Sequence, residues 1–177
     1  MLGKVWAEVK NPNGSKSLQP RLLEEGDHTI FSYVFKFVGF VDISDEYIHH
    51  GSIHRISVDK GCLAKVWHDT TPRLLGYGEH TIESTNFSYK GKVDIMSTPC
   101  IVHGTLTILR VTRGLVAVAW KDNEPTFIDT PGLYEVDSDN FQFVEFKDAE
   151  EQFIQLGAKK VILVQTGQVG VRRLKEG

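Results

Sequence analysis

Residues 105–157 read TLTILRVTRGLVAVAWKDNEPTFIDTPGLYEVDSDNFQFVEFKDAEEQFIQLG. This stretch is one copy of a sequence unit that occurs about three times in the chain. Shifting the numbering back by 53 positions places Trp120 on Trp67. The same shift, applied backward or forward, aligns further residues: Val111 with Val58 and Val164, Gly114 with Gly61 and Gly167, Pro125 with Pro72, and Gly157 with Gly104. So regular a register indicates an internal repeat.

The repeat divides the chain into four parts. They are a first repeat at residues 1–51 that lacks its leading strand, complete repeats at 52–104 and 105–157, and a partial fourth repeat at 158–177. Residues 11–17, NPNGSKS, are rich in turn formers and are interpreted as an insertion between two strands of the first repeat.

Each repeat predicts a series of short strands separated by turns. Aromatic and β-branched residues alternate between frequent glycine, proline and aspartate signals, which favours strands over helices. The predicted turn glycines are Gly26, Gly61, Gly78, Gly114, Gly132 and Gly167. Residues 148–160 could also form a short helix, but Pro99 stands in the equivalent stretch of the second repeat and argues against it. The fold class is therefore all-β, with tandem antiparallel repeats of about 53 residues.

Composition narrows the class of protein. A net charge of -3 without a dense Lys/Arg stripe argues against nucleic acid as a partner. Two cysteines are too few for a disulfide framework, and the N-terminus does not resemble a signal peptide, so an intracellular, cytoplasmic location is expected. The longest apolar runs are interrupted by charges, as at Lys36 and Asp42, and are too short to span a bilayer.

Seven histidines raise the hypothesis of a metal site, but the repeat weakens it. His50 recurs as His103 and then becomes Leu156. His28 recurs as His80 and becomes Tyr134. A position that accepts leucine or tyrosine in a sister repeat indicates packing or turn hydrogen bonding, so no metal ligand is assigned.

The recurring aspartates, Cys62 and the aromatic residues are also expected to have structural roles. Asp42, Asp94 and Asp148 recur in the repeats and are expected to cap turns. Cys62 lies beside a turn glycine without a flanking base, and the nucleotide-binding and hydrolase motifs are absent from the sequence. The aromatic residues could form a stacking platform, but core packing is the favoured interpretation. We therefore expect no catalytic residue and no cofactor.

The two partial repeats are out of phase, since the last has the leading strand that the first lacks. This arrangement indicates either a strand exchange, within the chain or with a neighbour, or a piece cut from a longer repeat protein, the second being slightly favoured. The candidate self-association strands contain Val161, Ile162, Leu163 and Val164 near one end, and Val5, Ala7 and Val9 near the other.

The segments VTRGLVAVAWKDNEPTFIDTPGLYEVDSDNF (residues 111–141) and VDKGCLAKVWHDTTPRLLGYGEHTIESTNF (residues 58–87) resemble the opening pattern of band-7 domains, the stomatin, prohibitin and flotillin group. They are also similar to the tandem β-repeats of the major vault protein. VQTGQVGVRRLKEG, at residues 164–177, fits the pattern best. The resemblance implies a non-catalytic scaffold that assembles side by side into rings, cages or membrane-associated platforms.

The favoured hypothesis is a scaffold that self-associates, as a homo-oligomer or a head-to-tail assembly, with peripheral membrane contact through partner proteins left open. The alternative is a monomeric β-trefoil-like module that binds a small ligand or carbohydrate, using clusters such as Trp67 with Asp69 and Trp120 with Asp122. An enzyme is the third and least favoured class.

Overall fold

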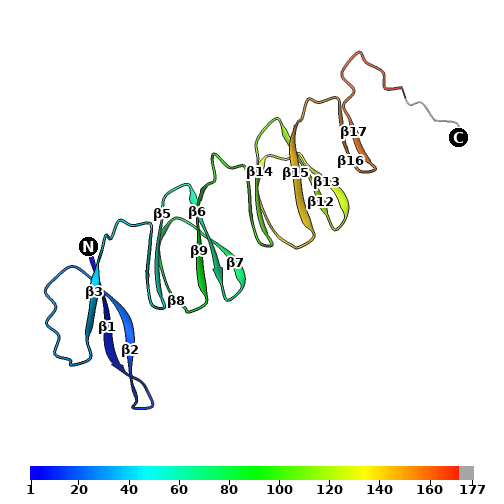
Figure 1. Cartoon of the computed structure of the whole chain (residues 1–177). Helices are drawn as coiled ribbons and strands as arrows, with labels where there is room; N and C mark the ends of the chain where they lie inside the picture. The colour runs from blue at the N-terminus through cyan, green and yellow to red at the C-terminus, as the bar shows by residue number, and fades with distance from the viewer. Residues whose placement is uncertain (172–177) are drawn as a thin grey trace. The chain divides into compact units, whose positions relative to one another are not determined.

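The computed structural model of the chain describes residues 1–171 and folds them into antiparallel strands joined by turns (Figure 1). None of these residues is helical, so no described helix could cross a membrane. The strands are β1 (Leu2–Lys10), β2 (Lys16–Leu23), β3 (Lys36–Val41), β4 (Tyr47–His50), β5 (Ile53–Val58), β6 (Cys62–His68), β7 (Thr71–Leu75), β8 (Gly78–Glu83), β9 (Phe87–Asp94), β10 (Cys100–His103), β11 (Leu106–Val111), β12 (Leu115–Lys121), β13 (Glu124–Ile128), β14 (Gly132–Asp137), β15 (Phe141–Asp148), β16 (Phe153–Leu156) and β17 (Lys159–Ile162). The predicted all-β class of tandem antiparallel repeats is confirmed.

The chain divides into two compact units, the first ending at Ser97 and the second beginning at Thr98. The first holds β1 to β9 and the second holds β10 to β17. Within the described residues, each unit contains one repeat made of two three-stranded sheets and one repeat that is incomplete.

In the first unit, the sheet β4-β5-β8 faces the sheet β7-β6-β9 (Figure 1). Every second residue of β5 is buried, from His54 through Ile56 to Val58. This period of two is that of a strand with one face against a core. The side chains of Ile56 and Val58 pack with Ala64 and Val66 of β6, so the core lies between the two sheets.

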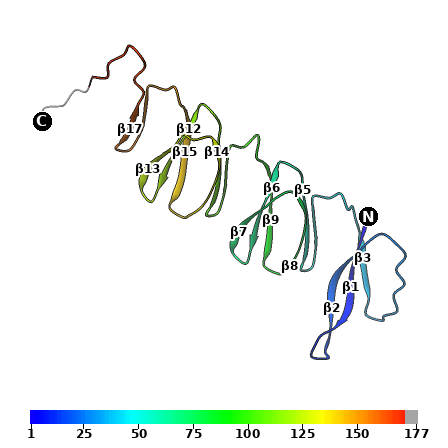
Figure 2. The same ribbon diagram turned by 180° about the vertical axis from the view of Figure 1, so that it is seen from behind.

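The second unit repeats this arrangement with the sheets β10-β11-β14 and β13-β12-β15 (Figure 2). Its strand β12 is buried on both faces, since four successive residues, Val116 to Ala119, are shielded from solvent. Val116 and Val118 pack with Ile154 of β16, which belongs to the next repeat. A sheet of one repeat is therefore covered on its outer face by the hairpin that follows it.

The hairpin turns explain why these strands pair locally. Asp69 and Thr70 have φ of 49° and 66°, and Asp122 and Asn123 have φ of 52° and 63°. Two successive residues with positive φ define the type I′ turn, whose twist matches that of the strands it joins. Each turn thus fixes the register of one hairpin, β6 with β7 and β12 with β13.

The incomplete repeats are the sheet β2-β1-β3 in the first unit and the hairpin β16-β17 in the second. The first corresponds to β7-β6-β9, because Trp6 lies opposite Pro20 as Trp67 lies opposite Pro72. Residues 24–35, between β2 and β3, form an irregular loop beside β3 (Figure 1). The hairpin β16-β17 corresponds to β4-β5. It lies where the sequence also allows a short helix, at residues 148–160.

The numerical repeat boundaries stay a prediction. The divisions at 51/52, 104/105 and 157/158 fall in the turns of the hairpins β4-β5, β10-β11 and β16-β17. A periodic chain can be divided at any equivalent point, so these positions mark the repeat length rather than the edges of sheets.

Candidate functional site

A tryptophan of one repeat packs against the hairpin turn of the next repeat within each unit. A Cβ atom added to Gly51 would lie 2.7 Å from Cγ of Pro20 and 3.0 Å from Cη2 of Trp6. A Cβ atom added to Gly157 would lie 2.7 Å from Cη2 of Trp120. These glycines are visible in the repeat spacing, but sequence alone does not show what lies against them.

His50 links the same two elements by a hydrogen bond. Its Nε2 lies 2.8 Å from the backbone carbonyl oxygen of Val5 and donates to it, since a carbonyl can only accept. The imidazole is buried and meets the ring of Trp6 edge-on, with 5.2 Å between ring centroids. This histidine therefore positions β4 against β1.

His54 lies in the core of the first unit with both ring nitrogens engaged. Nε2 donates to the backbone carbonyl oxygen of Ser84 at 2.9 Å, which leaves Nδ1 to accept from the hydroxyl of Tyr47 at 2.8 Å. Burial lowers the pKa of His54, with a smaller contribution from the neighbouring His49 ring. Burial also raises the pKa of Tyr47. The network holds a neutral imidazole.

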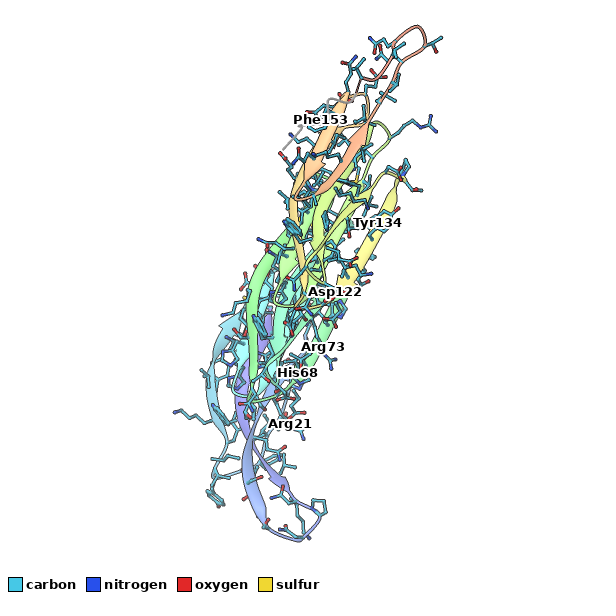
Figure 3. The ribbon with its side chains drawn as sticks, turned by 90° about the vertical axis from the view of Figure 1, so that its right-hand side faces the viewer. Arg21, His68, Arg73, Asp122, Tyr134 and Phe153 are labelled. Atoms are coloured by element: carbon cyan, nitrogen blue, oxygen red, sulfur yellow. The ribbon has the colours of Figure 1, made fainter. Side chains whose placement is uncertain are left out.

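At one turn position, a histidine or a tyrosine side chain forms a hydrogen bond with a backbone carbonyl oxygen of the turn. In each repeat the side chain bonds to the backbone carbonyl oxygen four residues earlier. The pairs are His28 with Glu24 at 2.8 Å, His80 with Gly76 at 2.8 Å, and Tyr134 with Thr130 at 2.7 Å. Figure 3 labels Tyr134.

Among residues 1–171, no group of three or more His, Cys, Asp or Glu side chains could hold a metal ion.

The recurring aspartates each accept a hydrogen bond from a backbone N–H two residues later. The bonds join Ser44 to Asp42 at 2.9 Å, Met96 to Asp94 at 2.7 Å, and Glu150 to Asp148 at 2.8 Å. The bond from the Ser44 backbone, followed by that from its hydroxyl, lowers the pKa of Asp42. These carboxylates stabilise the turns that follow β3, β9 and β15.

Asp69 and Asp122, which the ligand-binding hypothesis pairs with tryptophans, lie in the type I′ turns. Asp122 is labelled in Figure 3. Cys62 and Cys100 are free, half-buried thiols. Burial raises the pKa of the Cys100 thiol and so keeps it protonated near neutral pH.

The predicted turn glycines fall in three settings. Gly61, Gly114 and Gly167 have φ of 86°, 86° and 88°. Gly26 and Gly78 have φ of 140° and 122°, and Gly132 is the first residue of β14 without a positive φ. The role of all six as repeat turns stays a prediction, and at Gly132 the backbone is compatible with other residues.

The candidate self-association strands differ in whether they have a free edge. Val5, Ala7 and Val9 belong to β1, which lies at the centre of the sheet β2-β1-β3 and is hydrogen bonded on both sides. β1 therefore has no free edge, which corrects the expectation that its open edge could template pairing. Val161 and Ile162 lie in β17, and Leu163 and Val164 follow it directly.

β17 has a free edge among the described residues. It pairs with β16 alone, whereas its counterparts β5 and β11 lie between two neighbours. The side chains of Ile162 and Val164 are 62% and 51% exposed. Phe153 of β16, labelled in Figure 3, is also exposed.

The sheet β2-β1-β3 has an exposed apolar surface as well. Phe37 and Phe40 of β3 are 51% and 69% exposed. They line a hollow of about 520 Å³ together with Met1, Gly3 and Leu23, and with residues of the loop that follows β2, among them His28 and Ile30. In the complete repeat, the corresponding face of β6 lies against β5.

The chain is similar to two curated proteins of Dictyostelium discoideum. It is 28% identical to Vacuolin-B over 151 residues, which cover 77% of this chain and 25% of that protein. It is 27% identical to Vacuolin-A over 126 residues, which cover 64% of this chain and 21% of that protein. The chain thus spans about a quarter of the length of these relatives. No protein-family model matches it, and no solved structure is significantly similar.

Proposed function

We propose that this chain is a non-catalytic scaffold that self-associates through the surfaces of its β-repeats. The observation that carries the proposal is the exposure of apolar side chains on β3 and in and beside β17, strands that each pair on one side alone among the described residues. Burying one Phe or Ile side chain contributes about 1.5–3 kcal/mol, so such surfaces favour association.

The use of the reactive side chains supports a structural rather than a catalytic role. His50 and His54 bond backbone carbonyls, and Asp42 accepts bonds from the turn that follows it. Each of these groups stabilises a turn or a packed strand. A catalytic acid or base would need to face a substrate with its proton exchangeable.

We further propose that the scaffold is of the band-7 kind. The support is the glycine and proline pattern of the repeats together with the similarity to two vacuolins. Part of the pattern, residues 172–177, lies outside the described residues. The vault-like comparison, the cytoplasmic location and membrane contact through partner proteins stay predictions.

The β-trefoil alternative has less support from the strand pairing. A β-trefoil closes strands from three repeats into one barrel. Here each three-stranded sheet takes its strands from a local stretch of chain, such as β4-β5-β8 within residues 47–83. Local sheets of this kind are typical of tandem arrays in which neighbours stack.

The test is the mass of the purified chain over a wide range of concentration, measured by light scattering after size exclusion, with electron micrographs of the same fractions. We expect the mass to rise with concentration and the fractions to contain ordered assemblies. A concentration-independent monomer near 19.9 kDa would overturn the scaffold proposal, and carbohydrate and small-ligand screening would then test the β-trefoil alternative.

A further inference from the structure

The irregular loop of the first repeat contains a copy of a strand that the complete repeat uses. Residues 26–31 read GDHTIF, and β8 reads GEHTIE. In the complete repeat, β8 pairs antiparallel with β5, from Val58 opposite Gly78 to Ile53 opposite Glu83. Residues 26–31 form no strand, and Ile30 and Phe31 are 42% and 95% exposed.

The start of this loop already has the local structure of its counterpart. His28 bonds the carbonyl of Glu24 as His80 bonds the carbonyl of Gly76, both at 2.8 Å. The chain therefore leaves β2 with the turn that precedes β8, but residues 26–31 pair with no strand among residues 1–171.

A strand with the properties of β5 is present at the other end of the described chain, as β17. By the repeat, Val164 corresponds to Val58 and Ile162 corresponds to Ile56. β5 has β4 on one side and β8 on the other, whereas β17 has β16 on one side and no described strand on the other. One incomplete repeat thus has a free strand edge, and the other has a free strand sequence that fits it.

We propose that residues 26–31 of a second copy of this chain pair with β17, in the register that joins β8 to β5. The proposal rests on the self-association proposed above and names the segments that carry it. The expected opposite pairs are Val164 with Gly26, Leu163 with Asp27, Ile162 with His28, Val161 with Thr29, Lys160 with Ile30, and Lys159 with Phe31.

This pairing also completes a core between the two copies. In the complete repeat, Tyr47, Ile56 and Val58 pack with β6 and β9. Their counterparts on the β16-β17 side are Phe153, Ile162 and Val164, which are 49%, 62% and 51% exposed. The hairpin of one copy would therefore place an apolar face over the sheet β2-β1-β3 of the next, where the loop that contains Ile30 now lines the hollow.

The partly covered sheet β2-β1-β3 supplies the other half of that core. The core residues Cys62, Ala64, Val66 and Tyr89 correspond to Met1, Gly3, Val5 and Phe37. Val5 is already buried, whereas Met1 and Phe37 are 73% and 51% exposed and line the hollow on this sheet. Two incomplete repeats from different copies thus contain the parts of one complete repeat, and the contact generates a head-to-tail filament or ring.

The first experiment is cross-linking between two single-cysteine variants, each made with Cys62→Ala and Cys100→Ala. Thr29→Cys and Val161→Cys are mixed and oxidised, and because the cysteines are on different chains only an intermolecular pair gives a heterodimer. The register places these residues opposite each other, within reach of a disulfide. Asp27→Cys replaces Thr29→Cys as the matched control, two residues out of register.

We expect a heterodimer from the in-register mixture and at least tenfold less from the control. Equal yields, or none, while light scattering still shows assembly would overturn this pairing and leave the scaffold proposal standing. Monomers at all concentrations would overturn both.

The second experiment uses Ile30→Pro. In β8 the N–H of Ser84 donates to Ser52, so every second residue from there bonds to β5, including Ile82, the counterpart of Ile30. Proline at residue 30 therefore removes a donor to β17. Residue 30 is 42% exposed and outside any strand of its own chain, so the urea midpoint should change little. We expect the variant to remain monomeric at concentrations where the unchanged chain assembles. Persisting assembly would overturn the proposal, and Ile162→Asp checks the acceptor side in the same way.

Discussion

Cη2 of Trp120 lies 2.7 Å from the position that a Cβ atom on Gly157 would occupy. The same glycine has φ of +56°, in the left-handed region. Two independent constraints therefore require glycine here, one from the backbone and one from the ring of the preceding repeat. The relationship defines how one repeat receives the turn of the next within the second unit.

Gly157→Ala should destabilise the second unit strongly. The left-handed backbone costs a residue with a Cβ about 1–2 kcal/mol, and the overlap with the indole ring adds about 1–3 kcal/mol. We expect the free energy of unfolding to fall by the sum of these terms, measured by urea unfolding with tryptophan fluorescence.

Gly114→Ala is the matched control for this change. Gly114 has φ of +86°, but nothing lies within 4 Å of an added Cβ. It should therefore lose only the backbone contribution of about 1–2 kcal/mol. Equal losses in the two variants would contradict the contact between Trp120 and Gly157.

Much of the fold could be predicted from the sequence, because its signals are local and repeated. The period of 53 residues, the strand alternation and the turn aspartates such as Asp94 all act within a few residues of where they stand. The close approach of Trp120 to Gly157 could not be predicted in the same way. A glycine in the sequence shows that no side chain is present there, but it does not show which residue packs against that position.

The central place of β1 in its sheet could not be predicted from the sequence for a related reason. The alternation of Val5, Ala7 and Val9 is the same for a central strand and for an edge strand. Only the pairing order shows that β1 has neighbours on both sides. The sequence of residues 26–31 did contain the relevant signal, since it matches β8, but the loop has no local partner that would make it a strand.

The stability of the first unit should depend on the protonation of His54. Burial lowers the folded-state pKa of this histidine below the unfolded value of about 6.5. The unfolded state then binds more protons, so stability is complete above about pH 6.5 and falls as the pH decreases towards the folded pKa.

We expect the urea midpoint to fall as the pH decreases below about 6.5, and His54→Gln to flatten that dependence. His49, which stacks on His54 at 4.6 Å, faces it from β4, so His49→Gln is the control for a contribution from the neighbour. An unchanged slope in His54→Gln would contradict the assignment.

Thr70→Gly should stabilise the first unit. Thr70 has φ of 66°, which is strained for a β-branched residue. Relief of this strain, of order 1–3 kcal/mol, exceeds the entropic cost of a glycine, which is roughly 0.5–1 kcal/mol. Asn123→Gly at the equivalent turn should gain less, because asparagine tolerates the left-handed region. A larger gain at Asn123 in paired thermal and urea unfolding would refute this explanation.

His50→Leu should destabilise the first unit although leucine stands at the equivalent position, Leu156, in the second. The change removes the donor that lies 2.8 Å from the carbonyl oxygen of Val5. A buried acceptor that loses its partner costs about 1–3 kcal/mol. His50→Gln keeps a donor and should recover part of the loss in urea unfolding. If His50→Leu is as stable as the unchanged chain, the imidazole contributes packing alone, as leucine does beside Val116 and Val118.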